Sequence, residues 1–296
     1  MKIAIVGAGF SGSYLAHQLH KKGHSITLFE KSRGVGGRMA TRSMEQTKVN
    51  HGCNALQTKT EAFQSFCELM VQKNLLEKKD AHTYTASAMN TFLKYLSQNA
   101  TLKTDTLIKK IVYKNNRYTL TDQNEVEHKD FEFLLLTLPA PQILNMDFEL
   151  EEHLKEQLKT VQYESVATLV LTGKTLSELD KIQLSKINSL KKISLQNNNT
   201  YVIHMDKAFS NQHNHLNKNA ITPYIVNEIQ RVVPNFKLYN YNYFTHLWKY
   251  GFTSKPLNIP YVYNEKRNYA ISADWLMGES VEDAFLSAKK LLEERF

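Results

Sequence analysis

A glycine-rich turn, set between an apolar run and a helical run, opens this chain and constrains its fold more than any other feature. Residues 1–6 read MKIAIV, residues 7–12 read GAGFSG, and a helical pattern follows over 13–22. A second apolar run, 25–29, leads directly into Glu30. This order of strand, G-x-G-x-x-G turn, helix, strand and acidic residue is typical of a βαβ unit that binds the diphosphate of a dinucleotide.

Each residue of the turn has a mechanical reason to be there. Gly7 allows a tight exit from the strand, and Gly12 allows the helix to pack closely on it. Gly9 lacks a Cβ, so a diphosphate can approach the backbone. Phe10 and Ser11 then present free N–H groups at the positive end of the helix dipole.

Glu30 stands about 20 residues after the turn, where an acidic side chain accepts hydrogen bonds from ribose hydroxyls. Its negative charge disfavours a ribose that carries a 2′-phosphate, so the sequence argues against NADP in this site. We found no second glycine-rich dinucleotide motif after Gly52.

A loop rich in glycine and arginine follows, at 31–42, where a plain NAD dehydrogenase would begin a helix. It reads KSRGVGGRMATR, and its glycines let the backbone wrap closely over a large planar ligand. Arg33, Arg38 and Arg42 supply guanidinium groups, which suit a diphosphate. We therefore expect this loop to contact the dinucleotide.

The C-terminal end has a second strand-to-helix pattern. Residues 269–272 resemble a short strand, Asp274 follows, and Ser280 with Asp283 has the spacing of a helix capping pair. A helix after Ser280 is indicated by apolar residues at helical spacing, namely Val281, Ala284, Phe285, Ala288, Leu291 and Leu292.

Four segments together resemble the renalase-like bacterial FAD-dependent oxidoreductases of the flavin amine oxidase superfamily. They are FEKSRGVGGRMATR at 29–42, LTLPAPQ at 136–142, HLWKY at 246–250 and SADWLMGESVEDAFLS at 272–287. The resemblance is most specific at the two ends of the chain and weak between about 150 and 240. It implies FAD as the cofactor, with Asp274 bonded to the ribityl chain.

The resemblance also implies that the helix after Ser280 points its N-terminus at the flavin pyrimidine edge, where its dipole stabilises the reduced anion. The cofactor-binding residues we expect are Gly7, Gly9, Phe10, Ser11, Gly12, Glu30, Lys31, Gly36, Gly37, Arg38, Met39, Ile108, Leu138, Asp274, Ser280 and Val281.

The family's reaction, as the resemblance implies, is hydride transfer to flavin from dihydronicotinamide dinucleotide isomers, with amines as a broader substrate class. Since a second nicotinamide lobe is not evident, O2 is the expected acceptor, giving H2O2. His51, Trp248 and Tyr250 are the candidate catalytic residues on the substrate face, where an aromatic pair can sandwich a flat substrate. The alternative for Trp248 and Tyr250 is ordinary core packing.

Several residues depart from the family pattern on this face. The family carries DHGAQYF where this chain reads NHGCNAL, which places Asn50, Asn54 and Ala55 at the changed positions. Leu247 replaces an arginine, and Ala273 replaces a glycine. These changes keep a second hypothesis open, in which the protein binds FAD but has lost or altered its catalysis.

The predicted fold class is α/β, with a Rossmann-like FAD-binding lobe and an inserted mixed-sheet substrate lobe. We assign residues 1–60, 82–142 and 265–296 to the FAD-binding domain and 61–81 and 143–264 to the substrate domain. Periodicity predicts helices over 61–76, 87–98 and 149–158, and strands over 107–113, 117–121, 131–138 and 166–172. A turn is expected at Asn115–Asn116, and residues 174–222 give no clear pattern.

Charge and composition exclude several other classes. The net charge is +8, but the lysines are scattered without a basic, aromatic-interleaved stripe, which argues against nucleic acid. No apolar run is long enough to span a membrane and no signal peptide is visible, so we expect a cytoplasmic protein without membrane association. Cys53 and Cys67 give no disulfide framework. His213 and His215 lack nearby partners for a metal, and we expect none.

Overall fold

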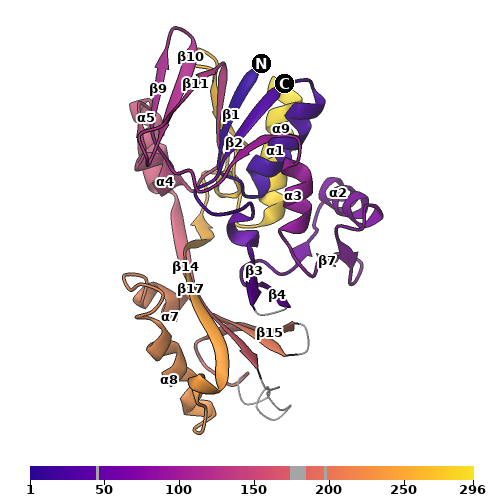
Figure 1. Cartoon of the computed structure of the whole chain (residues 1–296), viewed down its shortest axis with the longest axis vertical. Coiled ribbons are helices and arrows are strands. Elements are labelled where there is room, and N and C mark those ends of the chain that lie inside the picture. Colours follow the sequence, from indigo (N-terminus) through magenta and orange to yellow (C-terminus); the bar gives the residue numbers. More distant parts are fainter. Residues whose placement is uncertain (45–46, 174–184, 197–198) are drawn as a thin grey trace. The chain divides into compact units, whose positions relative to one another are not determined.

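The computed structural model describes residues 1–44, 47–173, 185–196 and 199–296, and it divides the chain into two compact units (Figure 1). The first unit comprises Met1–Ala40, Cys53–Gln162 and Thr253–Phe296, and the second comprises Thr41–Gly52 and Tyr163–Phe252. The second unit therefore interrupts the sequence of the first twice, in the manner of an inserted lobe.

A six-stranded sheet with the order β18-β19-β12-β1-β2-β8 organises the first unit. All neighbouring strands run parallel except β18, which is antiparallel to β19. The strands are β1 (Lys2–Val6), β2 (Ser25–Phe29), β8 (Thr101–Lys103), β12 (Phe133–Leu136), β18 (Val262–Asn264) and β19 (Tyr269–Ile271). The predicted α/β class with a Rossmann-like parallel sheet is confirmed.

The central strands are mostly apolar because both faces of the sheet are covered. Ile3 in β1, for example, lies in register between Phe133 and Ile26. Three helices pack on one face (Figure 1): α1 (Phe10–Lys21), α3 (Thr91–Ser97) and α9 (Val281–Arg295). On the other face β10 and β11 contact β12 and β1.

A second sheet of the first unit has the order β11-β10-β9-β13. Its strands are β9 (Ile108–Lys114), β10 (Arg117–Asp122), β11 (Glu127–Phe131) and β13 (Asp147–Phe148). The predicted turn at Asn115–Asn116 is confirmed, and both residues adopt the positive φ angles, 53° and 57°, that a tight hairpin needs. The helices α4 (Ala140–Leu144) and α5 (Glu152–Thr160) lie beside this sheet.

The small elements of the first unit complete the core. A three-stranded sheet combines β5 (Leu56–Gln57), β6 (Glu77–Lys78) and β7 (Thr83–Thr85) next to α2 (Glu61–Gln72). Two 3₁₀ turns are η1 (Gly37–Met39) and η3 (Asp274–Leu276). The helix predicted over 61–76 ends early, since Asn74 has a φ of 56°, and the one predicted over 87–98 begins only at Thr91.

The compact units differ from the predicted domain boundaries. Residues 61–81 belong to the first unit because Phe63 and Phe66 of α2 pack against Phe10 and Phe285 in its core. Residues 143–162 and 253–264 also lie in the first unit, whereas 41–52 lie in the second. The division into two units follows the packing of apolar side chains, which brings together residues that are far apart in the sequence.

The second unit is built on a four-stranded sheet with the order β15-β16-β14-β17. Its strands are β14 (Gln162–Gly173), β15 (Leu190–Gln196), β16 (Thr200–Met205) and β17 (Tyr241–Lys255), and a hairpin joins β3 (Thr41–Met44) to β4 (Thr47–Asn50). β16 is antiparallel to both β14 and β15. The remaining elements are α7 (Lys207–Gln212), α8 (Thr222–Val232) and η2 (Leu238–Asn240).

The strand predicted over 166–172 lies within β14, and the segment that gave no clear pattern contains β15, β16 and α7. Part of that segment, 174–184, lies outside the described residues. Ile203 of β16 and Ile225 of α8 are fully buried in the core of this unit.

Candidate functional site

The glycine turn after β1 has the packing that its residue types predict. Gly7 has a φ of 108°, and a Cβ there would lie 2.8 Å from Thr137 Oγ1. A Cβ on Gly12 would lie 1.9 Å from the carbonyl oxygen of Gly7. The close approach of helix and strand therefore depends on these two glycines.

Gly9 differs from its neighbours because it faces open space. A Cβ built on Gly9 meets no atom within 4 Å. Gly9 is also the N-cap of α1, without a side-chain cap, so the N–H groups of Phe10 and Ser11 lack intrahelical acceptors. Gly37 approaches this point, since its own Cβ would lie 3.2 Å from Gly9 Cα. An open helix N-terminus bordered by glycine is suited to an anion.

Glu30 is held rigidly beside this turn. Its side chain is buried, and its Oε2 and Oε1 accept hydrogen bonds from the N–H groups of Ala8 and Ser32, both at 2.9 Å. The backbone of Glu30 is fixed as well, because its N–H donates to Lys103 O and its carbonyl accepts from Thr106 N–H. Each carboxylate oxygen keeps a second lone pair for a ligand hydroxyl.

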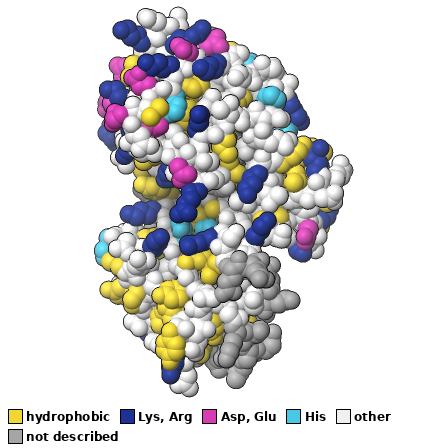
Figure 2. Space-filling model, viewed as in Figure 1, with side chains coloured by type: hydrophobic (Ala, Val, Ile, Leu, Met, Phe, Trp, Pro, Cys, Tyr) yellow, Lys and Arg dark blue, Asp and Glu magenta, His cyan; other side chains and the backbone are white. Residues whose placement is uncertain are grey.

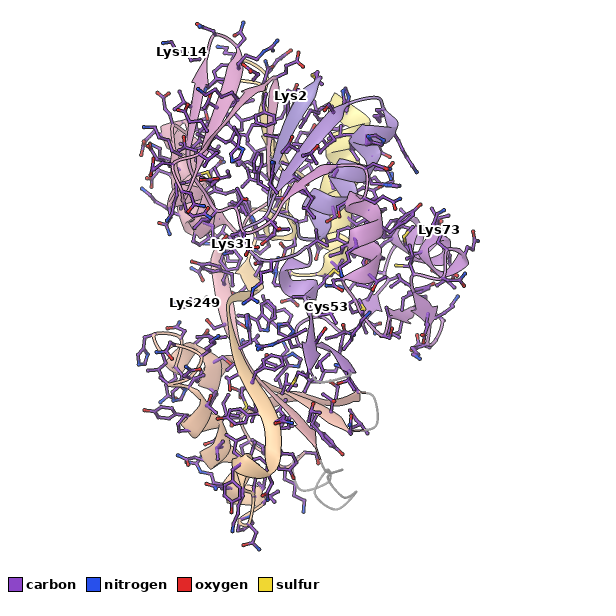
Figure 3. The ribbon with its side chains drawn as sticks, viewed as in Figure 1. Lys2, Lys31, Cys53, Lys73, Lys114 and Lys249 are labelled. Atoms are coloured by element: carbon purple, nitrogen blue, oxygen red, sulfur yellow. The ribbon has the colours of Figure 1, made fainter. Side chains whose placement is uncertain are left out.

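The loop after Glu30 is ordered by backbone contacts to the same turn. The N–H of Gly36 donates to Ala8 O at 2.9 Å. Met39 is buried in the core of the first unit. Lys31, at the carboxyl end of β2, is exposed, with its Nζ 3.3 Å from Gln142 Oε1 (Figure 3).

The three arginines that the sequence predicts at a diphosphate do not share one environment. Arg38 lies in the first unit, and its Nη2 is 2.6 Å from Asp274 Oδ1. Arg33 lies in the same unit and is exposed. Arg42 belongs instead to the second unit, where its guanidinium lies 4.4 Å from the centroid of the Phe244 ring.

Asp274 is the most informative residue of the C-terminal segment. It is 4% exposed, and its Oδ2 has no hydrogen-bond partner within the described ranges. A buried carboxylate oxygen left unsatisfied is costly unless a ligand donates to it. The turn at Gly9 is open to a diphosphate, and Asp274, paired with Arg38 through Oδ1, has its Oδ2 available to a hydroxyl. These features fit a dinucleotide whose diphosphate is joined to a polyol, as in FAD.

The helix predicted after Ser280 is α9, and its capping pair is confirmed. The Asp283 N–H donates to Ser280 Oγ at 3.1 Å, and the Ser280 N–H donates to Asp283 Oδ2 at 2.8 Å. Val281 follows, half-buried against the core of the first unit.

The other expected cofactor residues are placed as follows. Leu138 is half-buried, with its Cδ2 3.0 Å from a Cβ built on Gly7, and its carbonyl accepts from Trp275 Nε1 at 2.9 Å. Ile108 is buried at the start of β9. Neither of them is shown to contact a ligand, so their role stays a prediction.

In the second unit the structure brings two of the three candidate catalytic residues together. The rings of His51 and Trp248 stack, with centroids 5.2 Å apart and planes inclined by 28°. Trp248 Nε1 donates to His51 O at 3.4 Å, and His204 Nε2 lies 3.1 Å from the same oxygen. His246 packs against both rings, its centroid 5.2 Å from that of His51 and 4.0 Å from that of Trp248.

Burial keeps these histidines neutral. It lowers the pKa of His51 to about 3, with a further lowering from His246. Burial also lowers the pKa of His204 and of His246, each to about 4. His246 is additionally affected by the positive charges of Lys218 and Arg42. At neutral pH the cluster therefore offers uncharged imidazole rings and no acidic proton.

Tyr250 has its ring contact outside this cluster, and the expected enclosure of a flat substrate by Trp248 and Tyr250 stays a prediction. Tyr250 packs edge-on against Tyr163, at 5.2 Å between centroids. Residues two apart on a strand lie on one face about 6.6 Å apart, a spacing that leaves room for a flat ring between two aromatic side chains.

His204 and His246 are absent from our sequence-based candidates. The alternation of His246 and Trp248 along β17 was the available signal, because it places both on one face. His204 gave no such signal, since its position depends on the register between β14 and β16.

His213 is accounted for by local packing. Its Nδ1 lies 2.8 Å from Phe209 O, and its ring packs on Tyr224. Within the described ranges no group of three or more His, Cys, Asp or Glu residues is placed to hold a metal ion. Among the described helices, none has the length and hydropathy needed to cross a membrane.

Comparison with known sequences gives a family match at the start of the chain and relatives that match a short stretch. The family described as NAD(P)-binding Rossmann-like domain matches residues 5–69. The 4,4'-diapophytoene desaturases (4,4'-diaponeurosporene-forming) of Staphylococcus aureus strains Newman and USA300 are each 51% identical over 39 residues. That stretch is 13% of this chain and spans 8% of the length of these relatives.

Comparison with solved structures extends over the whole chain. A putative protoporphyrinogen oxidase from Exiguobacterium sp. 255-15 has a TM-score of 0.75 at 10% identity, covering 99% of this chain and 98% of that one. An oxidoreductase from Methanosarcina mazei has a TM-score of 0.67 at 12% identity, covering 99% and 100%. A CLA-producing fatty acid isomerase from P. acnes has a TM-score of 0.67 at 10% identity, covering 100% and 99%. At these identities the likeness shows a shared fold.

Proposed function

We propose that this protein is an FAD-dependent oxidoreductase of the renalase-like kind. Its substrates are dihydronicotinamide dinucleotide isomers or amines, and O2 is the acceptor. The observation that carries the proposal is the buried, unpartnered Oδ2 of Asp274, in the same unit as the open turn at Gly9. The Rossmann-like match and the oxidoreductase named among the structural neighbours support redox chemistry.

In this proposal the first unit holds the cofactor. The N–H groups of Phe10 and Ser11, with Gly9 open before them, bind the diphosphate. Glu30 accepts from the ribose hydroxyls of the adenosine half. Asp274 accepts from the polyol chain through Oδ2, while its Oδ1 stays bonded to Arg38.

When bound, FAD would supply two-electron chemistry, in which a hydride is taken from the substrate and its two electrons are passed to O2 to give H2O2. The chain contributes binding and orientation. The half-buried indole of Trp248, stacked on the buried ring of His51, is suited to contact with a planar substrate. Because burial keeps His51 and His246 uncharged at neutral pH, neither ring is present as an imidazolium acid.

A second candidate is an FAD-binding protein whose catalysis is lost or altered. It is favoured by Asn50, which stands where the family has an acidic residue. Asn50 is buried, its Oδ1 accepts from Thr41 Oγ1 at 2.7 Å, and its backbone N–H donates to Gln196 Oε1 at 3.0 Å. These contacts build Asn50 into the sheet and give it no acid–base chemistry.

One experiment separates the two. The flavin-loaded protein is mixed anaerobically with 2- or 6-dihydronicotinamide dinucleotide, and separately with simple amines, while the flavin absorbance is followed. Bleaching by the dihydronicotinamides, with one H2O2 released per turnover once oxygen is admitted, supports the renalase-like function. Bleaching only by amines supports the broader amine oxidation. A flavin that no donor bleaches supports the second candidate.

A further inference from the structure

The second unit contains a pocket of about 560 Å³ that none of the sequence motifs predicts. It is lined by the segment that leads into α8, by the first two turns of that helix and by the start of β17, with Arg42 from β3. All of its lining residues belong to this one unit. Its volume lies within the range of about 300–1,000 Å³ that is typical of small-molecule sites.

The charge of the pocket lining is of one sign. Arg42 and Lys218 both line it, and no Asp or Glu is among its described lining residues. Both side chains are exposed, and neither forms an ion pair with a carboxylate in the part of the chain that the structure describes. The positive charges of Lys218 and Arg42 also act on the interior of the unit. Burial is the largest cause of the lowered pKa of His246, and these two charges lower it further. A concave site with two cations that have no carboxylate partner among the described residues attracts an anion.

The remainder of the lining combines apolar and aromatic side chains with four polar ones, Asn219, Thr222, Asn227 and Thr245. Phe244 is 8% exposed, and the guanidinium of Arg42 lies over its ring. Val226 and Leu238 line the pocket from α8 and η2 and are half-buried. Tyr243, which is 47% exposed, adds an aromatic wall. Hydrophobic side chains gather on the face of this unit that carries α7 and α8, as Figure 2 shows.

The hydroxyls of the pocket are already engaged. Thr222 Oγ1 and Thr245 Oγ1 lie 2.7 Å apart, and Thr222 Oγ1 donates to Lys218 O at 3.0 Å. The pocket therefore offers two cationic groups and several apolar side chains, with the amides of Asn219 and Asn227 as its other neutral polar groups.

We propose that this pocket binds an amphipathic organic anion. The charged headgroup, a carboxylate or a phosphate, is held by Lys218 and Arg42, and the apolar body lies against Phe244, Val226 and Leu238. This inference does not rest on the proposed flavin chemistry, because every residue that it uses lies in the second unit and the readout is binding.

The test is calorimetric titration of the full-length protein, with the probes below the concentrations at which they form micelles. Decanoate and decyl phosphate carry the two headgroups, decanol lacks the charge, and inorganic phosphate lacks the apolar body. We expect one site per chain for at least one amphiphilic anion, and which of the two binds more tightly identifies the headgroup. Decanol and inorganic phosphate are expected to bind at least about tenfold more weakly, because each lacks one half of the recognition.

The matched variants are Lys218→Met and Lys249→Met. Both remove one exposed lysine charge from the second unit, but Lys249 does not line the pocket (Figure 3). Lys218→Met is expected to weaken binding about tenfold, and Lys249→Met to leave it unchanged. The proposal is overturned if neither amphiphilic anion binds, if decanol or inorganic phosphate binds as tightly as the amphiphilic anions, or if the two variants weaken binding equally. Since both lysines are exposed, a thermal melt of each variant checks that the fold is unchanged.

Discussion

The guanidinium of Arg38 lies 2.6 Å from the carboxylate of Asp274, joining residues that are 236 positions apart in the chain. Arg38 stands in η1, in the loop after β2, and Asp274 begins η3 after β19. The ion pair thus ties the opening glycine-rich region to the C-terminal segment within the first unit. It also fixes one oxygen of Asp274, while the other has no hydrogen-bond partner among the residues that the structure describes.

Removal of the arginine from this pair is expected to destabilise the first unit. Arg38→Met leaves the Asp274 side chain, which is 5% exposed, without its cation. We expect the free energy of unfolding of the cofactor-free protein to fall by about 1–3 kcal/mol, the cost of an unsatisfied buried polar group. Urea unfolding measures this. The control is Lys31→Met, which changes an exposed cation of the same loop. It is expected to change the free energy of unfolding by less than about 0.5 kcal/mol.

Two glycine variants separate folding from cofactor binding. Gly9→Ala places a methyl group in open space, so the protein is expected to fold normally but to bind FAD at least about tenfold more weakly, because the methyl group obstructs the diphosphate. Gly12→Ala forces a Cβ to 1.9 Å from Gly7 O and is expected to destabilise the fold itself. Thermal melts and FAD titrations of both variants are the measurements. Equal FAD affinity in Gly9→Ala and the wild type would contradict the proposed diphosphate position.

Glu30→Gln is expected to destabilise the contact between the turn that follows β1 and the loop that follows β2. A glutamine side chain has one acceptor oxygen, so it cannot accept from the N–H groups of both Ala8 and Ser32. We expect a loss of about 1–3 kcal/mol in the free energy of unfolding, because one backbone donor is left without its partner. The control is Glu132→Gln, which alters an exposed carboxylate that also accepts from a backbone N–H. A loss in Glu132→Gln as large as in Glu30→Gln would show that burial is not the cause.

The histidine cluster predicts a dependence of stability on pH. His51, His204 and His246 have folded-state pKa values of about 3, 4 and 4. Below the ordinary histidine pKa of about 6.5 the unfolded chain binds protons that the folded chain does not. The free energy of unfolding is therefore expected to fall as the pH drops from about 6.5 toward 4, by up to about 1.4 kcal/mol per pH unit for each histidine.

Urea unfolding of His204→Gln over this pH range tests the assignment. The variant keeps a donor for His51 O but removes one titrating ring, so the slope is expected to decrease. His215→Gln changes an exposed histidine of the same unit and is expected to leave the slope as it is. An unchanged slope in His204→Gln would contradict the account.

The sequence predicted the first unit well because its signals are local. The turn at Gly7–Gly12, the capping pair Ser280 and Asp283, and the hairpin at Asn115–Asn116 each depend on residues within a few positions of one another. Such patterns restrict the backbone whatever the rest of the chain does.

Features that depend on long-range packing could not be predicted in this way. The place of α2 in the first unit follows from contacts of Phe63 with Phe10 and Phe285, far away in sequence. The burial of His204 beside His51 needs the register of two strands, and the pocket at Lys218 needs α8 and β17 folded together. Arg42 shows the same limit, because its loop position indicated a diphosphate and its hairpin places it over Phe244.

The central claim, that the first unit binds FAD, is tested most directly by titrating the cofactor-free protein with FAD and recording the shift of the flavin absorbance bands. The account predicts one FAD per chain for the wild type, and markedly weaker binding by a folded Gly9→Ala protein. A wild-type protein that melts cooperatively yet does not bind FAD, even at high cofactor concentration, would contradict it.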